Sequence, residues 1–390
     1  MKIVIVGAGK VGVALTRHLA VENRVTVIDQ NPHLVENIIN IYDVMGVCGN
    51  GASYDVQKEA DVEQADLLIA TTSSDEINIL TCLVAKKMGV QHTIARIRSP
   101  EYGRQLRFMR SELGLSMAIN PEAATAREIA RVLRFPTAMK LESFSKGRLE
   151  LVEYRVAEHT ALDGTRLSEL YRNFKVRVLI CAVARQGETI IPSGDFTLRA
   201  GDKIYLTAAP RELEKFFRLL GVFRARASSV MIVGASKMCY YLASELLEMG
   251  MSVKIIDQNE QRCVEMSEKL PRALVIVGDG TDSELLSEEG ISQTDAFVAI
   301  TGLDEANILM ALSAAKQSGD CCKVVAKINR KSLLELVSTE SLIDSVVSTG
   351  AVTTELILQY IRAMKNASAS KVKTLHRIVD EKVEALEFSV

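Results

Sequence analysis

The sequence has few of the features that mark membrane, secreted or nucleic-acid-binding proteins. It contains no run of about 18 apolar residues that could cross a bilayer. It opens on a strand pattern, without the basic, apolar and small-residue regions of a signal peptide. The 47 basic and 49 acidic residues nearly cancel, to a formal net charge of -2, so no broad basic surface is indicated. We therefore expect a cytoplasmic chain with no nucleic-acid partner and no direct membrane insertion.

Cysteine patterns and catalytic motifs are also scarce. The seven cysteines are odd in number and form no CxxC pair, which argues against a disulfide framework or a zinc site. Most are expected to be small buried side chains; the adjacent Cys321 and Cys322 could be redox-active, but their spacing is not thioredoxin-like. The five histidines are scattered, and no HExxH, GxSxG or P-loop motif occurs. We therefore predict no catalytic residue and no metal site.

The sequence contains two copies of one series of apolar runs separated by helical patterns. In residues 1–136 the apolar runs are KIVIVG, VTVID, VMGVCG, DLLIATT, TIARIR and SMAIN. In residues 228–366 the runs VMIVG, VKIID, ALVIVG, AFVAIT, VVAKIN and DSVVS return in the same order. Nearly continuous apolar runs between helices are typical of parallel strands covered on both faces. The sequence thus predicts an α/β chain with two Rossmann-like, doubly wound parallel-sheet domains, related by duplication.

The segment between the two copies differs in character. Residues 137–222 contain the strand-like runs LELVEYRV, VRVLICAVAR, ETIIP and KIYLTA and end in the amphipathic pattern RELEKFFRLLG. They predict a small α+β lobe, with a boundary at Val222 to Ser229 before the second copy. Residues 367–390 form a linker and then VEALEFSV, which aligns with LELVEYRV. We expect the first strand of an incomplete second small lobe there, as in a shortened chain or one that has lost a fourth lobe; chance similarity is the alternative.

Capping patterns mark three helix starts, at Ser73, Ser99 and Asn120. Ser73 and Glu76 have the spacing of a capping box. Asn120 precedes Pro121 and Glu122, which offers an N-cap, a proline at the first helical position and an acid at the positive end of the helix.

The first copy opens with a glycine loop that predicts a nucleotide site. Gly7 permits a tight turn, Gly9 lets the backbone approach a pyrophosphate, and Gly12 lets the helix pack on the strand. Asp29 ends the next strand and can accept hydrogen bonds from a ribose 2′-hydroxyl, whereas it would repel a 2′-phosphate. This favours NAD(H) or an adenosine nucleotide such as ATP or ADP over NADP. The candidate loop contacts are Gly7, Ala8, Gly9, Lys10, Val11 and Gly12.

The second copy has an altered loop. Gly234 is kept, but Ser236 and Cys239 replace the next two glycines, with Lys237 between them. Asp257 corresponds to Asp29. The sequence predicts a weaker or differently selective site here, and a structural role without ligand is the open alternative.

Further candidates lie where other strands end. Carboxyl ends of parallel strands meet at one edge, where such sheets bind ligands. Each of these candidates also has a simpler interpretation: Thr72 and Thr301 as helix caps, Arg96 and Lys327 as solvated charges, and Asn50 and Asp279 as turn residues between glycines. The candidates are Thr72, Thr301, Arg96, Lys327, Asn50 and Asp279.

The ordered motifs resemble a known family. GAGKVG, Asp29, GNG, TTSSDEINI, IARIRSPEY and GDFTLRAGDKIYL, followed by a repeat, are similar to the TrkA family of cytosolic regulatory subunits of Trk potassium uptake systems, built from RCK domains. The resemblance implies N-lobes that bind NAD(H) or ATP/ADP, a homo-oligomeric ring, and docking under a TrkH-like membrane transporter. It would make the first glycine loop, Asp29, Asn50, Thr72 and Arg96 the contacts of the first site. Their counterparts would be Gly234, Asp257, Asp279, Thr301 and Lys327.

The resemblance implies regulation rather than catalysis. A nucleotide would shift the ring between two conformations for which its affinities differ, and the ring would pass that bias to the membrane partner. The competing class is an NAD-dependent oxidoreductase, which needs a proton donor or acceptor beside the nicotinamide. A redox-sensing repressor would need a basic helix-turn-helix, which the sequence does not show.

Overall fold

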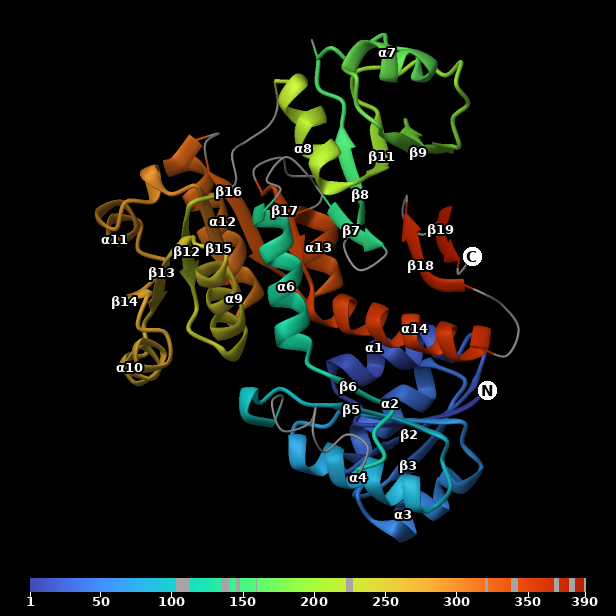
Figure 1. Cartoon of the computed structure of the whole chain (residues 1–390). Coiled ribbons are helices and arrows are strands. Elements are labelled where there is room, and N and C mark those ends of the chain that lie inside the picture. Colours follow the sequence, from blue (N-terminus) through green and yellow to red (C-terminus); the bar gives the residue numbers. More distant parts are fainter. Residues whose placement is uncertain are drawn as a thin grey trace. The chain divides into compact units, whose positions relative to one another are not determined.

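The structure is a computed structural model whose described residues build four sheets (Figure 1). It describes residues 1–102, 113–134, 140–144, 148–158, 160–221, 227–319, 322–337, 343–367, 372–378 and 383–388. Two sheets have six strands, one has five and one has two. Cys321, residues 222–226 of the expected boundary and residues 389–390 of the expected last strand lie outside the described residues.

The first six-stranded sheet is parallel, in the order β3-β2-β1-β4-β5-β6. The chain reverses its direction of strand addition between β1 and β4, so the carboxyl ends of these two strands flank the point where doubly wound sheets bind ligands. Its strands are β1 (Lys2–Val6), β2 (Arg24–Asp29), β3 (Met45–Cys48), β4 (Leu67–Ala70), β5 (His92–Arg96) and β6 (Met117–Ile119). The helices are α1 (Lys10–Leu19), α2 (Pro32–Ile41), α3 (Tyr54–Glu59), η1 (Val62–Gln64), α4 (Asp75–Lys87) and α6 (Pro121–Arg134).

The central strands of this sheet are apolar along nearly their whole length because helices cover both faces of the sheet. Every residue of β4 is buried, and Ile5 and Val27 are fully buried in their strands, because helices lie over the sheet. Helix α1 packs on β1 and β2, α2 on β2 and β3, and α4 on β4 and β5. The central strands therefore have no solvent-facing side, which is why their sequences do not alternate.

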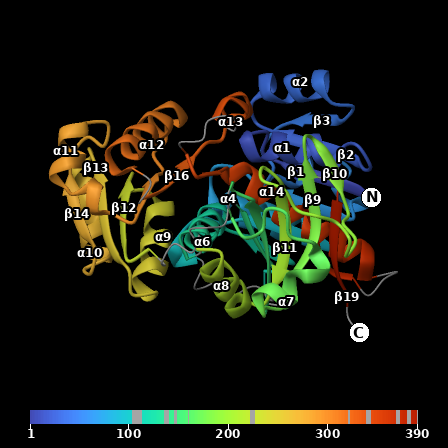
Figure 2. The same ribbon diagram turned by 90° about the horizontal axis from the view of Figure 1, so that it is seen from above.

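The second six-stranded sheet repeats the first, in the order β14-β13-β12-β15-β16-β17. Helix α10 packs on β13 and β14, and α12 on β15 and β16 (Figure 2). The predicted α/β class with two Rossmann-like domains is therefore confirmed. The strands are β12 (Ser229–Val233), β13 (Ser252–Asp257), β14 (Leu274–Val277), β15 (Ala296–Ala299), β16 (Lys323–Lys327) and β17 (Ser345–Val347). The helices are α9 (Lys237–Glu248), α10 (Glu260–Lys269), α11 (Ser283–Glu288), η4 (Ile291–Gln293), α12 (Asp304–Ser318), α13 (Lys331–Val337) and α14 (Thr349–Ala367).

The small lobe between them is an antiparallel sheet in the order β10-β9-β11-β8-β7, as the α+β prediction requires. Phe216, on α8, lies edge-on to Phe174 with ring centroids 5.4 Å apart, and both belong to the buried core. Strand β7 and helix α7 were not anticipated from the sequence. The elements are β7 (Lys140–Phe144), β8 (Leu149–Arg155), η3 (Leu167–Glu169), α7 (Leu170–Phe174), β9 (Leu179–Arg185), β10 (Glu188–Ile190), β11 (Lys203–Ala208) and α8 (Pro210–Leu219).

The last described segment is a hairpin. Strand β18 (Val372–Ile378) pairs antiparallel with β19 (Val383–Phe388), as β7 pairs with β8. The expected strand VEALEFSV coincides with β19 over the residues that the structure describes.

The cap predicted at Asn120 is confirmed, whereas the capping box predicted at Ser73 and Glu76 is wrong. Asn120 Oδ1 accepts the amide of Ala123 at 2.8 Å, as expected. The N-cap of α4 is Ser74 and not Ser73, since Ser74 Oγ accepts the amide of Ile77 and donates to Glu76. The capping box itself does not form, because Glu76 accepts the hydroxyl of Ser74 and not its backbone amide, which donates to Thr72 Oγ1 at 3.4 Å.

Other expectations concern cysteines and membrane spans. Cys82, Cys239, Cys263 and Cys322 are buried, while Cys48 is exposed. Within the described residues, none of the helices combines the length and apolarity needed to span a bilayer.

The small lobe depends on one buried carboxylate. Asp202, 1% exposed, accepts Arg185 Nε and Nη2 at 2.7 Å each and the amide of Arg199 at 2.8 Å. The Arg185 guanidinium also lies 4.8 Å from the ring centroid of Phe196. Bidentate pairing fixes the end of β9 to the start of β11.

Asp202→Asn should loosen this lobe. The amide removes the charge and puts a donor where an acceptor is needed, which costs about 1–3 kcal/mol. Amide hydrogen exchange in β9 and β11, followed by mass spectrometry, should accelerate by roughly tenfold to a hundredfold. The matched control is Glu214→Gln, which breaks an exposed pair with Arg218 and should change exchange little. Equal effects of the two variants would contradict a special role for Asp202.

Candidate functional site

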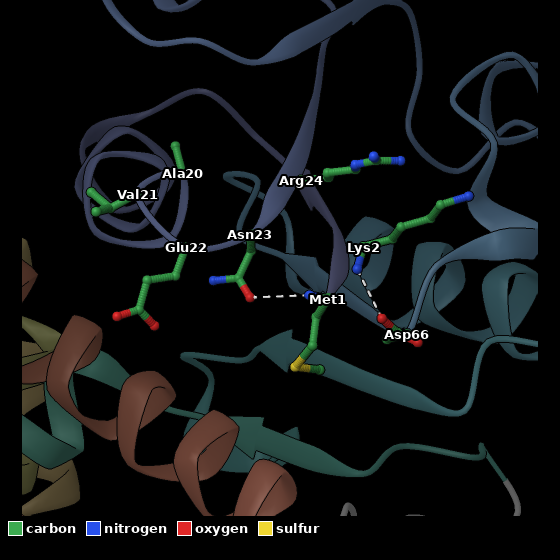
Figure 3. Close-up of a pocket in the computed structure, with 8 residues that line it drawn as sticks. All are labelled: Met1, Lys2, Ala20, Val21, Glu22, Asn23, Arg24 and Asp66. Carbon is green, nitrogen blue, oxygen red and sulfur yellow. Dashed lines mark hydrogen bonds between the residues drawn. The ribbon is translucent and has the colours of Figure 1, made fainter.

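We call the two Rossmann-like domains the first lobe and the second lobe. A hollow of about 500 Å³ in the first lobe lies away from the predicted nucleotide site. Figure 3 shows its lining at the amino ends of β1 and β2, where Lys2 N–H donates to Asp66 Oδ2 at 2.8 Å. The glycine loop follows the carboxyl end of β1. The hollow and the predicted nucleotide site are therefore at opposite edges of the sheet.

Two of the three loop glycines are required by the fold. Gly7 has φ +103°, and a Cβ there would lie 2.9 Å from the carbonyl carbon of Thr71. A Cβ on Gly12 would lie 1.8 Å from Gly7 O, so only glycine lets α1 start this close to β1.

Gly9 is different. It is the exposed N-cap of α1, with φ −74° and ψ −172°, a backbone conformation that any residue adopts. A Cβ added to it would meet nothing within 4 Å. The protein itself therefore gives no reason for glycine here, whereas a ligand that approaches the backbone does.

The start of α1 can bind an anion. No side chain caps it, so its first amide groups keep unused N–H donors, at the positive end of the helix dipole. Lys10 is exposed at the first helical position. Ala8 and Val11 are 1% and 7% exposed as whole residues, so neither offers its side chain to a ligand.

Asp29 ties three loops together. Its Oδ2 accepts the amide of Ala8 at 2.6 Å, its Oδ1 accepts the amide of Asn31 at 2.8 Å, and its carbonyl accepts the amide of Gly49 at 2.9 Å. Each carboxylate oxygen has a second lone pair for a ribose hydroxyl. The residue thus orders the glycine loop and can also bind sugar.

The loop after β3 reaches the same edge. A Cβ on Gly51 would lie 2.1 Å from Val6 Cγ1, so this loop packs on the last residue of β1. Asn50, exposed beside it, accepts the amide of Ala52 at its Oδ1 at 3.0 Å. The structure therefore brings Asn50 to the edge that carries the glycine loop and Asp29.

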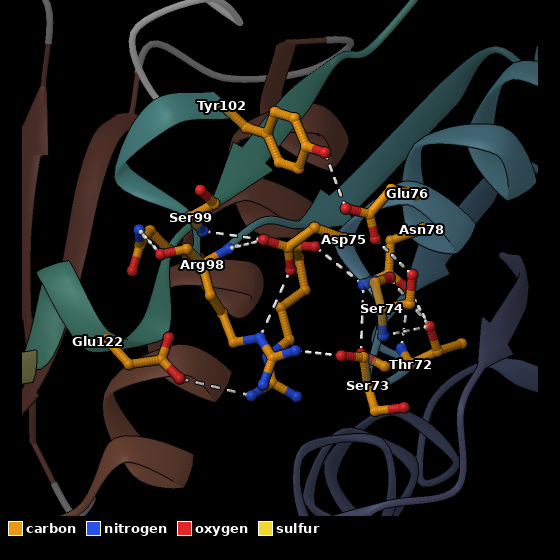
Figure 4. A network of polar contacts seen from close by, with 12 residues as sticks. Thr72, Ser73, Ser74, Asp75, Glu76, Asn78, Arg98, Ser99, Tyr102 and Glu122 are labelled. Atoms are coloured by element: carbon orange, nitrogen blue, oxygen red, sulfur yellow. Dashed lines mark hydrogen bonds and ion pairs between the residues drawn. The ribbon is translucent and has the colours of Figure 1, made fainter. Parts of the chain in front are cut away.

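A buried amide that the sequence analysis missed positions Thr72. Asn78 is fully buried, and its Oδ1 accepts both the amide of Thr72 at 2.8 Å and its hydroxyl at 2.7 Å (Figure 4). Asn78 Nδ2 donates to the carbonyl of Arg96 at 2.8 Å. One side chain thus joins the ends of β4 and β5 and orients the Thr72 hydroxyl.

Asp75 makes a second link in this network. Its carboxylate, 5% exposed, accepts the amides of Arg98 and Ser99 at 2.8 Å each, and Arg98 also reaches the carbonyl of Ser73 (Figure 4). Hydrogen bonds to Glu76 come from the hydroxyls of Ser74 and Tyr102, and the one from Ser74 contributes most to lowering the pKa of Glu76 to about 2. Glu76 therefore remains an anion throughout the physiological range.

Arg96 lies at the end of β5 with an incomplete set of partners. Its Nη2 is 3.6 Å from Glu122 Oε1, and its Nε has no partner among the described residues. Burial lowers the pKa of Arg96, and the neighbouring carboxylate of Glu122 opposes that shift. A partly buried guanidinium with spare donors is suited to phosphate.

The second lobe repeats the hydrogen bonds of the aspartate and asparagine side chains. Asp257 Oδ2 accepts the amide of Ala235 at 2.7 Å, and a Cβ on Gly280 would lie 2.2 Å from Val233 Cγ1. Asn307, fully buried, accepts the amide of Thr301 at 2.9 Å and donates to the carbonyl of Lys327 at 2.8 Å. Asp304 accepts the amides of Asn329 and Arg330 at 2.9 and 2.8 Å, as Asp75 accepts those of Arg98 and Ser99.

The start of α9 departs from that of α1. Ser236 Oγ accepts the amide of Cys239 at 3.4 Å and so occupies a donor that is unused at α1. Cys239 carries a Cβ where Gly12 has none, so α9 cannot approach its strand as α1 does. Lys327 Nζ lies 3.4 Å from the carbonyl of Ile300. Fewer helix N–H groups remain for phosphate in the second lobe.

The structure thus gathers the candidates of each copy at one sheet edge. The residues that the sequence analysis missed are Asn78, Asn307, Asp75 and Asp304. Their signal was the Asp-Glu-x-Asn pattern at residues 75–78 and 304–307, present in both copies.

The comparisons agree with this repeat. The TrkA-N domain family matches residues 3–121 and again 230–349, and the TrkA-C domain family matches residues 151–221. The chain belongs to the TrkA family. It is 34% identical to "Trk system potassium uptake protein TrkA" of Vibrio alginolyticus over 391 residues, covering 99% of this chain and 84% of that protein. It is 32% identical to a TrkA homologue of Archaeoglobus fulgidus over 374 residues, covering 96% of this chain and 84% of that one.

Solved structures share the fold of this TrkA-family chain. The GsuK RCK domain matches with a TM-score of 0.71 at 20% identity, over 96% of this chain and 79% of that one. The GsuK channel bound to NAD matches with a TM-score of 0.71 at 21% identity, over 97% of this chain and 66% of that one. At this identity the likeness shows the fold alone.

Alanine at two glycines separates folding from ligand contact. Gly9→Ala should change stability by less than about 1 kcal/mol, since the added methyl enters open space at a helix N-cap. Gly12→Ala should lower the melting temperature by several degrees, because it drives a methyl into the Gly7 carbonyl. Thermal unfolding followed by circular dichroism measures both. Equal losses would mean that the fold also needs Gly9.

Proposed function

We propose that the first lobe binds NAD(H) or an adenine nucleotide such as ATP or ADP. The observation that carries this proposal is Gly9, a glycine that neither its backbone angles nor its neighbours require. Around it lie the uncapped start of α1 for the phosphates, Asp29 for the ribose and Arg96 for further phosphate charge. Solved structures with this fold support the ligand class, since they include the GsuK channel bound to NAD and GsuK bound to ADP.

The role we propose is regulatory. The chain would assemble as a ring at the inner face of the cell membrane and gate a TrkH-like potassium transporter, remaining peripheral and cytoplasmic. The names of the 32–34% identical relatives, which are Trk system potassium uptake proteins, support this role. The fold that this chain shares with the GsuK RCK domain supports assembly. The proposed lobes are residues 1–136, 137–222 and 228–366, with 367–390 as linker and first strand of an incomplete lobe.

The two sites in one chain would be unequal. The second lobe keeps the polar framework at Asp257, Asp279, Thr301 and Lys327, but its helix start is partly satisfied by Ser236. A phosphate at α9 would have to displace that hydrogen bond. We therefore propose weaker binding in the second lobe, involving Gly234, Ser236 and Lys237.

Calorimetry on the full chain tests the proposal. ATP, ADP and NADH should bind, while NADPH should bind more weakly because Asp29 repels its 2′-phosphate. Asp29→Ala should weaken nucleotide binding more than Asp257→Ala does. The two variants are matched, since each leaves one glycine-loop amide, of Ala8 or of Ala235, without its carboxylate.

Three results would count against it. No binding of ATP, ADP or NADH would end the nucleotide proposal and leave the repeat as a scaffold. Equal losses in the two aspartate variants would contradict unequal sites. Oxidation of NADH with a bound substrate, followed by its absorbance, would favour the oxidoreductase class.

A further inference from the structure

The two copies present different chemical groups at the end of their third strands. In the first, Ala52 N–H donates to the Asn50 side chain at 3.0 Å. Only the carbonyl oxygen of an amide can accept this bond, so the oxygen must face Ala52. The Nδ2 group, a donor, is left without a partner among the described residues of an exposed side chain.

In the second copy the corresponding group is an acceptor. Thr281 donates its amide at 2.9 Å and its hydroxyl at 2.8 Å to the same oxygen, Oδ1 of Asp279. Within the described part of the chain Oδ2 has no partner, and the side chain is exposed. The two hydrogen bonds from Thr281 hold the pKa of Asp279 below its usual range, so the carboxylate stays ionised.

Strand order places this residue at the base of a bound nucleotide. Strands β3, β2 and β1 are neighbours, about 4.8 Å apart, and end at one edge. With phosphates at α1 and ribose at Asp29, a nucleotide runs outward from β1 past β2, so its base arrives at β3. Gly51, packed on Val6, and Gly280, packed on Val233, hold the two loops at that position.

Resting on the proposed function, we propose that this position sets base selectivity. Asp279 restricts the second site to purines that carry a 6-amino group, while Asn50 lets the first site accept 6-oxopurines as well. Adenine offers a donor at N6, whereas hypoxanthine and guanine offer an acceptor at O6. A carboxylate pairs with the amino group and repels the oxo group. An amide nitrogen pairs with O6 or with a ring nitrogen of adenine.

Inosine diphosphate is the probe, because it differs from ADP at the six-position. The quantity measured by calorimetry is the ratio of the Kd for inosine diphosphate to the Kd for ADP. An Asp257→Ala background isolates the first site and an Asp29→Ala background isolates the second. Nicotinamide hypoxanthine dinucleotide against NAD repeats the comparison for the dinucleotide.

Exchanging the two side chains should exchange the preferences. Asn50→Asp should raise the ratio at the first site by about tenfold or more, as expected for an unpaired, repelled acceptor, with little change for ADP. Asp279→Asn should lower the ratio at the second site by a similar factor. Both changes are nearly isosteric and keep the oxygen that Ala52 or Thr281 uses, so neither should affect folding.

The outcomes separate the two proposals. Normal ADP binding with ratios that neither exchange alters would overturn base selectivity alone. Absence of binding by ADP and NAD to the unmodified chain would overturn the proposed function and this inference with it. If only the second site fails to bind, the claim for Asp279 falls and Asn50→Asp decides the claim for the first site.

Discussion

The position of α1 depends on one close approach, between the carbonyl of Gly7 and the α-carbon of Gly12. No side chain fits between them, since a Cβ on Gly12 would lie 1.8 Å from Gly7 O. The helix therefore starts directly at the end of β1, and its first amides point at the sheet edge. Asp29 holds the loop in this geometry through the amide of Ala8. The other candidates are useful only because this contact fixes the helix start that they surround.

Duplication preserved the framework more strictly than the contact surface. The buried groups that join strand ends are the same in both copies: an aspartate on the loop amides, an asparagine between the fourth and fifth strands, and a glycine against the end of the first. Two of the differences lie at groups that would touch a ligand, Gly9 against Ser236 and Asn50 against Asp279, and a third, Gly12 against Cys239, lies where the helix packs on its strand. Buried hydrogen bonds are costly to break, whereas an exposed side chain can change with little effect on folding.

The repeated parallel sheets and the glycine loop could be predicted from the sequence because they follow from local patterns. Apolar runs define the strands, and the spacing from Gly7 to Asp29 defines the turn and the next strand end. The roles of Asn78 and Asp75 could not, since each bonds to a backbone group 18 to 24 residues away whose position depends on strand register. The same limit explains why Ser73 was predicted as the cap in place of Ser74, since two neighbouring hydroxyls compete for one helix start. It also explains why β7 was missed, since the position of this strand is set by its pairing with β8.

A ligand can regulate a protein only if its binding changes contacts within that protein. A ligand shifts a conformational equilibrium only through groups that it contacts differently in the two states. Arg96 is suited to this, because among the described residues it pairs with Glu122, in the first turn of α6. Helix α6 leads along the chain to the small lobe. A phosphate beside Arg96 would compete with Glu122 for the guanidinium, and Glu122 Oε2 already lacks a partner among the described residues. Under the proposed function, the Arg96 guanidinium therefore both binds the nucleotide and pairs with Glu122 at the start of α6. Nucleotide binding and the position of α6 would then be coupled through this one side chain.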